Sequence, residues 1–269
     1  MKAILYLTTA AILWGINFHF AKTMMNDVKF IEAGFWRYLF GILPLFALAY
    51  KQLPSWKVIR ENLKGVVLVG VVCLFGFNIL FFIGMKYSPA INGALIISMS
   101  PMLTLLFANR ILKTPLERKH IIGVSISLIG VLYLISKGNL LNFLEIDFSF
   151  SDILLLICST LFAFQNVWIK QYGSNISNIN FTFLTNLICF LGFLMVLPFT
   201  GTGNIQSYSF TFWFSAIGIG FFGTAAAYYL WNEGIKLTSP NQAAMMINII
   251  PLSAAVISII LGVGIAYLI

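Results

Sequence analysis

An apolar segment near the start of the chain, AAILWGINFHFAK at residues 10–22, carries four side chains that can bind a ligand or hold charge: Trp14, Asn17, His19 and Lys22. An amide in hydrocarbon costs free energy unless it is hydrogen-bonded, so Asn17 either joins two helices or contacts a substrate. Trp14 lies about midway along the segment, away from the interface where tryptophan collects, which favours a lining or gating role. His19 can carry a proton near neutral pH, but it faces away from Asn17, and helix packing is the better interpretation.

The second half of the chain holds a counterpart of this segment. LFAFQNVWIK at 161–170 aligns with LWGINFHFAK at 13–22, and the alignment pairs Gln165 with Asn17. Both amides are therefore candidate substrate contacts, and interhelical hydrogen bonding is the alternative for each.

Aromatic and polar side chains also gather around residue 228. Trp231 and Asn232 follow Tyr228 by three and four positions, so both are its neighbours on a helix. Asn78, in the middle of an earlier apolar run, aligns with Tyr228 in the second half. These residues are further candidates for substrate binding, because aromatic rings can stack on a planar substrate or hold a cation.

Two aligned prolines, Pro101 and Pro251, follow Ser98 and Asn248 by three positions. A proline inside a membrane helix removes a backbone hydrogen bond, and a nearby side chain or water can satisfy the freed carbonyl. The pattern predicts a kink with local repair, a hinge beside the binding site, or both. Ser98 and Asn248 are then also candidate substrate contacts.

One basic residue, Arg37, falls inside an apolar run. Such residues are usually functional or paired, and the alternatives are snorkelling to the interface or pairing with Glu32. No carboxylate falls securely in the middle of a predicted span, which argues against a proton cycle driven by a carboxylate.

The elements that must position these residues are membrane helices. The 269 residues are 60% hydrophobic and 9% charged, with a mean hydropathy of +0.95, whereas soluble domains carry about 25% charged residues. A membrane span needs roughly 20 apolar residues. The apolar runs predict an all-α integral membrane protein with nine clear spans and a stub of a tenth, at about 3–22, 31–50, 65–85, 89–110, 120–137, 151–170, 180–199, 211–231, 237–260 and the tail after them.

An internal repeat organises these spans. GMKYSPAINGALIISMSP at 84–101 aligns with GIKLTSPNQAAMMINIIP at 234–251 at an offset of 150, close to the offset of 148 for the first pair. Similar offsets in two places predict duplication of a five-span unit, and an odd number of spans inverts the second copy. We expect two inverted five-helix repeats with the binding site between them, at 1–137 and 151–269, joined by a loop at 138–150.

The second repeat is shorter than the first. Pro101 and Gly130 are 29 positions apart, whereas Pro251 and Gly264, their counterparts, are 13 apart. The difference, 29 minus 13, leaves about sixteen residues without a counterpart near 262–264, so the tenth helix is expected to be truncated or incompletely represented.

Charge predicts the orientation of the chain, whose net charge is +8. With a cytoplasmic N-terminus, the inside segments hold eleven Lys and Arg residues and the outside segments hold four, as the positive-inside rule requires. The basic residues lie between hydrophobic runs, which favours membrane orientation over nucleic-acid binding. Three cysteines lie in apolar runs without metal-ligand spacing, so neither a metal nor a cofactor is predicted.

The motifs together resemble the drug/metabolite transporter superfamily, in its EamA-like ten-helix branch. The pieces that carry the resemblance are LWGINFHFAK, FWRYLFG, GMKYSPAINGALIISMSPMLTLLFANRIL, LKTPLERKHIIG, GVLYLI and AAAYYLWNEGIKLTSPNQAAMMINIIPLSAAV. Where the family usually has L-G-E-x-L, this chain has Lys113 and Thr114 in place of the Gly and Glu. The resemblance implies a central cavity lined mainly by spans 1, 3, 4, 6, 8 and 9, and substrates such as amino acids, nucleosides, amines or toxins.

The predicted function is secondary transport, in which a small metabolite is exported across the inner membrane by alternating access. Neither a catalytic reaction nor a cofactor is predicted. The partners are this small molecule and membrane lipid, and the oligomeric state stays open. One alternative is a non-transporting membrane scaffold or receptor. The other is a membrane enzyme acting on lipid, which needs clustered His, Cys or acidic residues. The chain has two His residues, His19 and His120, and no HExxH motif or phosphate-binding Gly-rich loop.

Overall fold

The computed structural model describes residues 1–87, 96, 99–135 and 150–260. In this part of the chain every regular element is a helix. The predicted contact Ser98, residues 138–149 of the predicted loop at 138–150, and the tail at 261–269 lie outside the described residues.

The described part of the first half contains six α-helices and two other helical segments. A 3-10 turn η1 ends the second helix, and a π-helical segment η2 joins α3 to α4 into one continuous span. The bounds are α1 Lys2–Met24, α2 Phe30–Ala49, η1 Tyr50–Gln52, α3 Trp56–Val67, η2 Leu68–Gly76, α4 Phe77–Tyr87, α6 Ser100–Leu112 and α7 Arg118–Ile135.

The second half follows a similar plan, with a π-helical segment η6 between α10 and α11. The bounds are α8 Phe150–Tyr172, η4 Gly173–Asn175, α9 Asn178–Thr200, η5 Ile205–Ser207, α10 Phe210–Gly218, η6 Ile219–Ala226, α11 Ala227–Leu237, α12 Pro240–Ile247 and α13 Ile249–Ile260. Within the described ranges, seven helices are long and apolar enough to cross a membrane. The predicted count of ten stays a prediction.

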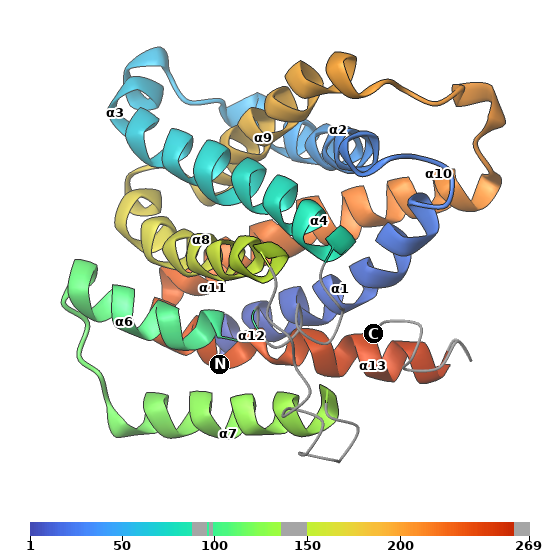
Figure 1. Cartoon of the computed structure of the whole chain (residues 1–269). Helices are drawn as coiled ribbons and strands as arrows, with labels where there is room; N and C mark the ends of the chain where they lie inside the picture. The colour runs from blue at the N-terminus through green and yellow to red at the C-terminus, as the bar shows by residue number, and fades with distance from the viewer. Residues whose placement is uncertain (88–95, 97–98, 136–149, 261–269) are drawn as a thin grey trace.

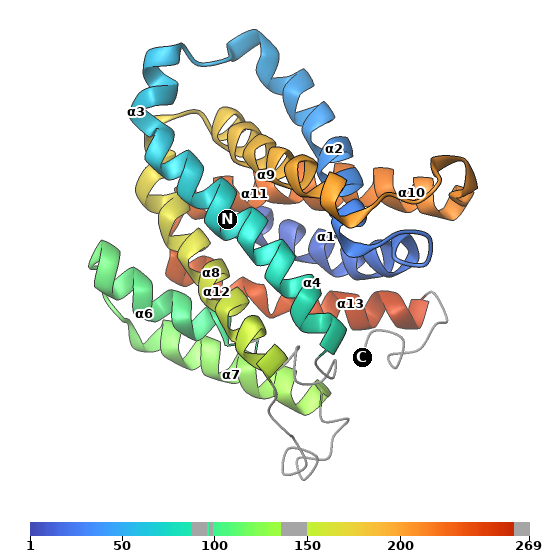
Figure 2. The ribbon, with the colours of Figure 1, turned by 45° about the horizontal axis from the view of Figure 1, so that its top comes forward.

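Helices of one half pack against helices of the other half, so the two halves do not form separate bundles (Figure 1). Helix α1 packs against α11 and α13, α2 packs against α9 and η6, and α4 packs against α8. Figure 2 shows the continuous span from α3 to α4 running beside α8, while α6 and α7 lie together on the other side of α8. The core of the molecule is therefore built from both halves.

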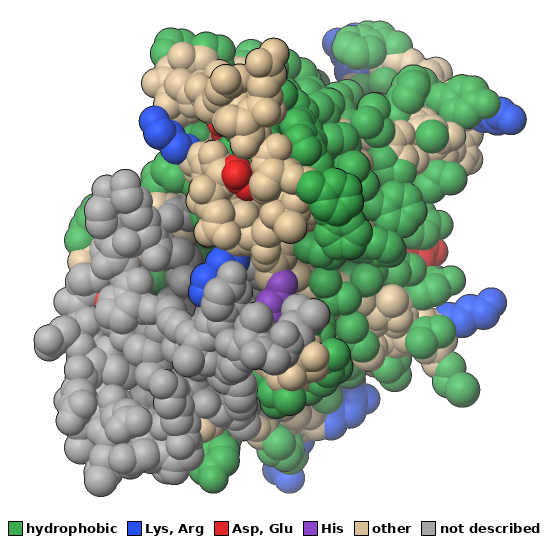
Figure 3. Space-filling model, turned by 90° about the vertical axis from the view of Figure 1, so that its right-hand side faces the viewer, with side chains coloured by type: hydrophobic (Ala, Val, Ile, Leu, Met, Phe, Trp, Pro, Cys, Tyr) green, Lys and Arg blue, Asp and Glu red, His purple; other side chains and the backbone are tan. Residues whose placement is uncertain are grey.

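The distribution of polar side chains suits a lipid environment. Large hydrophobic side chains such as Leu48, Phe199 and Ile259 are exposed, and apolar side chains cover much of the face drawn in Figure 3. Polar side chains lie inside and bond one another: Trp231 Nε1 donates to Asn166 Oδ1 at 2.9 Å. Because no water competes in hydrocarbon, such bonds hold membrane helices together.

The two π-helical segments occupy corresponding places in the halves. Gly76 ends η2 and Ala226 ends η6, so the two ends lie 150 positions apart, which is the offset of the second sequence match. A π-helical segment inserts extra backbone into a helix and turns the residues that follow onto a different face. Asn78 and Tyr228, the aligned candidate contacts, lie two positions after these ends.

Each predicted hinge proline lies in the first turn of a helix. Pro101 is the second residue of α6, and Pro251 is the third residue of α13, which follows a break in the helix at Asn248. In the first turn of a helix, proline's missing N–H costs no hydrogen bond. At Pro251 the sequence predicts a kink inside a continuous helix, whereas the structure has a break just before the proline. The hinge role of both prolines stays a prediction.

Candidate functional site

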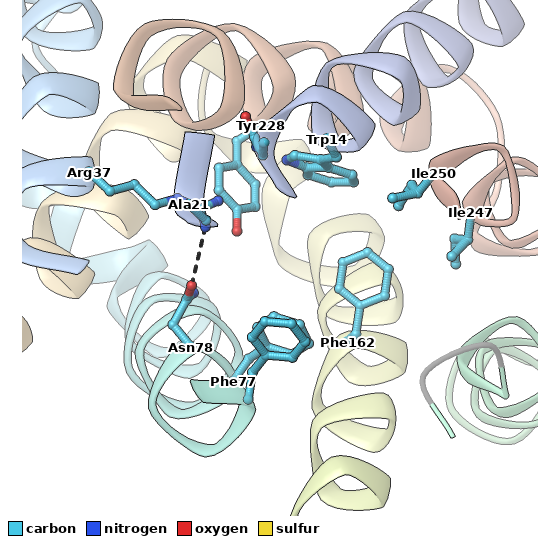
Figure 4. A pocket seen from close by; sticks show the side chains of 11 residues that line it. Trp14, Ala21, Arg37, Phe77, Asn78, Phe162, Tyr228, Ile247 and Ile250 are labelled. Atoms are coloured by element: carbon cyan, nitrogen blue, oxygen red, sulfur yellow. Dashed lines mark hydrogen bonds between the residues drawn. The ribbon is translucent and has the colours of Figure 1, made fainter. Parts of the chain in front are cut away.

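A cavity of about 150 Å³ lies in the core of the molecule, between helices of both halves. We call it the central cavity. Its lining comes from α1, α2, α4, α8, α11, α12 and α13, and consists of Trp14, Asn17, Ala21, Arg37, Phe77, Asn78, Phe81, Phe162, Tyr228, Ile247 and Ile250. Figure 4 shows Arg37 and Asn78 at one side of this cavity and Phe162, Ile247 and Ile250 at the other.

One face of α1 contributes Trp14, Asn17 and Ala21, which follow one another at helical spacing. Trp14 donates from Nε1 to the backbone oxygen of Gly223 in η6 at 3.0 Å. Asn17 packs against the same glycine, and among the described residues neither atom of its buried amide has a hydrogen-bond partner. The amide is therefore free to bond a molecule in the cavity.

A polar network closes one side of the cavity. Arg37 donates from Nε to Thr224 Oγ1 at 3.1 Å and from Nη1 to Asn78 Oδ1 at 3.5 Å (Figure 4). Asn78 in turn donates from Nδ2 to the Tyr38 hydroxyl at 2.9 Å and to the Leu74 carbonyl at 2.7 Å. The network fixes the guanidinium and the Asn78 amide at the cavity wall.

Close approach of α2 and η6 makes this network possible. A Cβ atom on Gly41 would lie 2.5 Å from the Thr224 side chain, so a larger residue at position 41 would push the two helices apart. Gly41 follows Arg37 by one helical turn. The glycine therefore brings Thr224 within reach of the guanidinium.

Aromatic rings form the rest of the wall. Trp14 makes edge contacts with Tyr228 and Phe162, at ring-centre distances of 5.3 and 5.9 Å. Phe77 lies 5.9 Å from Phe162 and 5.6 Å from Phe81. Such a surface offers an apolar or planar molecule contacts on several sides.

Four of the predicted substrate contacts line the cavity, and four others are buried away from it. Trp14, Asn17, Asn78 and Tyr228 are in the lining, whereas Gln165, Trp231, Asn232 and Asn248 are not.

Two of the residues outside the lining hold helices together. Trp231 bonds Asn166, and Asn232 Nδ2 donates to Thr182 Oγ1 at 2.9 Å. Gln165 and Asn248 each have one amide nitrogen without a partner among the described residues. Their role as substrate contacts stays a prediction.

Several lining residues are not among the predicted substrate contacts. The sequence shows Arg37 as a charge inside a span but not the direction of its side chain, so snorkelling and pairing with Glu32 are alternatives to a functional role. The structure pairs Glu32 differently: it accepts bonds from Trp36 Nε1, the Gly203 amide and the Tyr208 hydroxyl. Phe77, Phe81, Phe162, Ile247 and Ile250 carried no signal, because apolar residues are common throughout the chain.

His19 lies outside the cavity lining. Its Nε2 is 3.4 Å from the Ala254 carbonyl oxygen of α13, and 8% of the residue is exposed. The imidazole thus contacts a neighbouring helix at a place where α1 and α13 pack together.

The EamA-like transporter family matches residues 1–136 and 149–265, which is nearly the whole chain. The chain belongs to the EamA-like transporter family. Membership confirms the resemblance drawn from the motifs and establishes a multi-pass, all-α membrane transporter rather than an enzyme.

Curated relatives and a solved structure agree with this family. An uncharacterized transporter YyaM of Bacillus subtilis (strain 168) is 26% identical over 254 residues, covering 94% of this chain and 83% of the relative. An uncharacterized transporter of Archaeoglobus fulgidus is 24% identical over 266 residues, covering 95% and 87%. A crystal structure with 17% identity has a TM-score of 0.79 and covers 97% of this chain and 88% of that one, which shows the same fold.

Proposed function

We propose that this EamA-family transporter is a secondary transporter that exports a small metabolite across the inner membrane by alternating access, with the central cavity as its binding site. The observation that carries the proposal is the cavity itself. It combines polar groups with aromatic walls in the core, and both halves of the chain line it: Asn17 and Asn78 come from the first half, Phe162 and Tyr228 from the second.

An inverted repeat supplies the motion in this proposal. The family match in two ranges and the two π-helical segments whose ends are 150 positions apart support a duplication at 1–137 and 151–269. In transporters built from inverted repeats, one repeat rocks against the other around a site between them. The proposed orientation has the N-terminus in the cytoplasm, in accord with the excess of positive residues in the inside segments.

A two-step experiment tests the proposal. Thermal-shift measurements on the purified protein with amino acids, nucleosides and quaternary amines identify binders, because a ligand stabilises the folded state by mass action. Flux of each binder into proteoliposomes is then measured, with protein-free liposomes as the control. We expect at least one binder to be transported.

A scaffold or a receptor is expected to give no flux for any compound in this experiment. Binding without flux for every member of the panel would contradict secondary transport and favour a receptor. Neither binding nor flux would favour a scaffold.

A further inference from the structure

Arg37 brings a fixed positive charge to a cavity whose other lining side chains, among the described residues, are uncharged. Arginine stays protonated in proteins, and a charge within a membrane-spanning helix is costly unless it is compensated. The guanidinium donates to Thr224 and Asn78, both of which are neutral acceptors. Two of its three nitrogens are thus bonded, and hydrogen bonds alone do not neutralise the charge.

Among the residues that the structure describes, no carboxylate forms an ion pair with Arg37. Glu32 is the acid in the same helix, and it is directed elsewhere. Its Oε1 accepts from Trp36 and Tyr208, and its Oε2 accepts from the Gly203 amide. The positive charge at the cavity therefore has no counter-charge within the described chain.

The described side chains at the opposite side of the cavity are apolar. Figure 4 places Phe162, Ile247 and Ile250 away from Arg37. The volume of about 150 Å³ matches that of an apolar protein cavity that holds benzene. The space thus suits a compact apolar group of about the size of one ring.

We propose that the central cavity binds a small organic carboxylate with one compact apolar group, and that Arg37 binds the carboxylate. This inference rests on the proposed function and names its substrate class. A planar guanidinium can donate two parallel hydrogen bonds to a carboxylate. Asn17, with an amide that has no partner among the described residues, supplies a further polar contact. An amine cation is disfavoured because Arg37 repels it, and repulsion is strong in a medium of low dielectric constant.

Three ligands that share a phenylpropyl skeleton test this inference on the unmodified protein. Binding of 3-phenylpropionate, 3-phenylpropanamide and 3-phenylpropylamine to the full chain in nanodiscs is measured by isothermal titration calorimetry. We expect the carboxylate to bind about 30-fold or more tightly than the amide and the amine. Equal or tighter binding of the amide or the amine, or no binding of the carboxylate, would overturn the inference.

Variants of Arg37 test the assignment of the residue. Arg37→Gln removes the charge and is expected to abolish the preference for the carboxylate. Arg37→Lys keeps the charge but not the planar group that donates two parallel hydrogen bonds, so it is expected to retain part of the preference. Arg60→Gln, an exposed position in α3, is the matched control and leaves the preference unchanged. Wild-type preference in Arg37→Gln would overturn the assignment. If Arg37→Gln fails to fold, the three-ligand comparison on the wild-type protein decides.

Flux measured in parallel separates this inference from the proposed function. Transport of amines or nucleosides without binding of the carboxylate would overturn the inference and leave secondary transport standing. Carboxylate binding that depends on Arg37, without flux of any compound, would support the inference and contradict the transport function.

Discussion

Trp14 in α1 donates a hydrogen bond from Nε1 to the backbone oxygen of Gly223 in η6, across 3.0 Å. The same glycine leaves room for Asn17, since a Cβ atom at position 223 would lie 2.0 Å from the nitrogen and the oxygen of that amide. One backbone position in the second half of the chain thus fixes two cavity residues from the first half.

Gly223→Ala is therefore expected to displace Asn17 and disturb the cavity. Overpacking of this kind costs about 1–3 kcal/mol of stability, and flux should fall with it. The matched control is Gly76→Ala in the other π-helical segment, where the nearest atoms are 3.5 and 3.6 Å from the added carbon. Flux and thermal denaturation measured on both variants check this, and equal behaviour of the two alanines would contradict the role of Gly223.

Asn17→Leu is expected to abolish flux with little loss of folded protein. Because the buried amide has no partner among the described residues, an apolar side chain of similar shape removes no protein hydrogen bond. Gln165→Leu, at the aligned position outside the cavity, should retain more flux than Asn17→Leu. Proteoliposome flux, with protein yield from size-exclusion chromatography, checks both variants. Wild-type flux in the double variant would end the proposed role of both amides.

The sequence predicts Trp14, Asn17, Asn78 and Tyr228 as substrate contacts, because polar or aromatic residues are unusual in the middle of an apolar span. The structure brings all four to one cavity, and their role as substrate contacts stays a prediction. It gives less guidance for Gln165. A buried amide is as compatible with a place between two helices as with a place at a cavity. Which of the two the helix face of Gln165 meets depends on tertiary packing, which the periodic pattern of the sequence does not contain.

Neither the direction of the Arg37 side chain nor the π-helical segments can be predicted from the spacing of apolar residues. A charged side chain inside a span can extend to the interface or turn inward. The direction of the Arg37 side chain depends on its hydrogen bond to Thr224, which is 187 positions away in the sequence. The extra backbone in η2 and η6 changes the helical phase, so a period of 3.6 residues assigns the wrong faces to the residues after Gly76 and Ala226.

Tyr228→Phe is expected to retain most of the flux, and Tyr228→Ala to lose it. The Tyr228 ring packs against Trp14 at 5.3 Å, so the ring shapes the cavity wall. Tyr228→Phe removes the hydrogen bond between the Tyr228 and Tyr38 hydroxyls, but it leaves the donor and the acceptor of the Asn78–Tyr38 bond in place. Flux assays on the two variants check this expectation, and a loss in Tyr228→Phe as large as that in Tyr228→Ala would assign the essential role to the hydroxyl.

Tyr208→Phe is expected to weaken the attachment of the loop between α9 and α10 to α2, which contains Glu32. The Tyr208 hydroxyl donates to the buried Glu32 carboxylate, and hydrogen bonds to charged groups are worth about 1.5–3 kcal/mol. Burial and the adjacent Glu32 raise the pKa of Tyr208 above its ordinary value of 10.0, so the hydroxyl keeps its proton and this contribution persists at neutral pH. It should disappear only in alkaline solution, as the pH rises through the raised pKa.

Thermal denaturation in detergent, with Tyr50→Phe as the control, measures this effect. Tyr50 is exposed in η1 and its substitution should leave the midpoint unchanged. An unchanged midpoint in Tyr208→Phe would show that the bond to Glu32 does not stabilise the fold.

Filling the central cavity with a larger side chain tests whether the transported compound binds there. Ala21 lines the cavity, so Ala21→Phe places a ring in the proposed substrate space, while Leu48→Phe adds a ring at an exposed position. Flux of a broad metabolite panel is measured in proteoliposomes that hold equal amounts of wild-type, Ala21→Phe or Leu48→Phe protein. We expect the wild-type and Leu48→Phe proteins to move the same compound and the Ala21→Phe protein not to move it. Undiminished flux in Ala21→Phe would contradict the assignment of this cavity as the transport site.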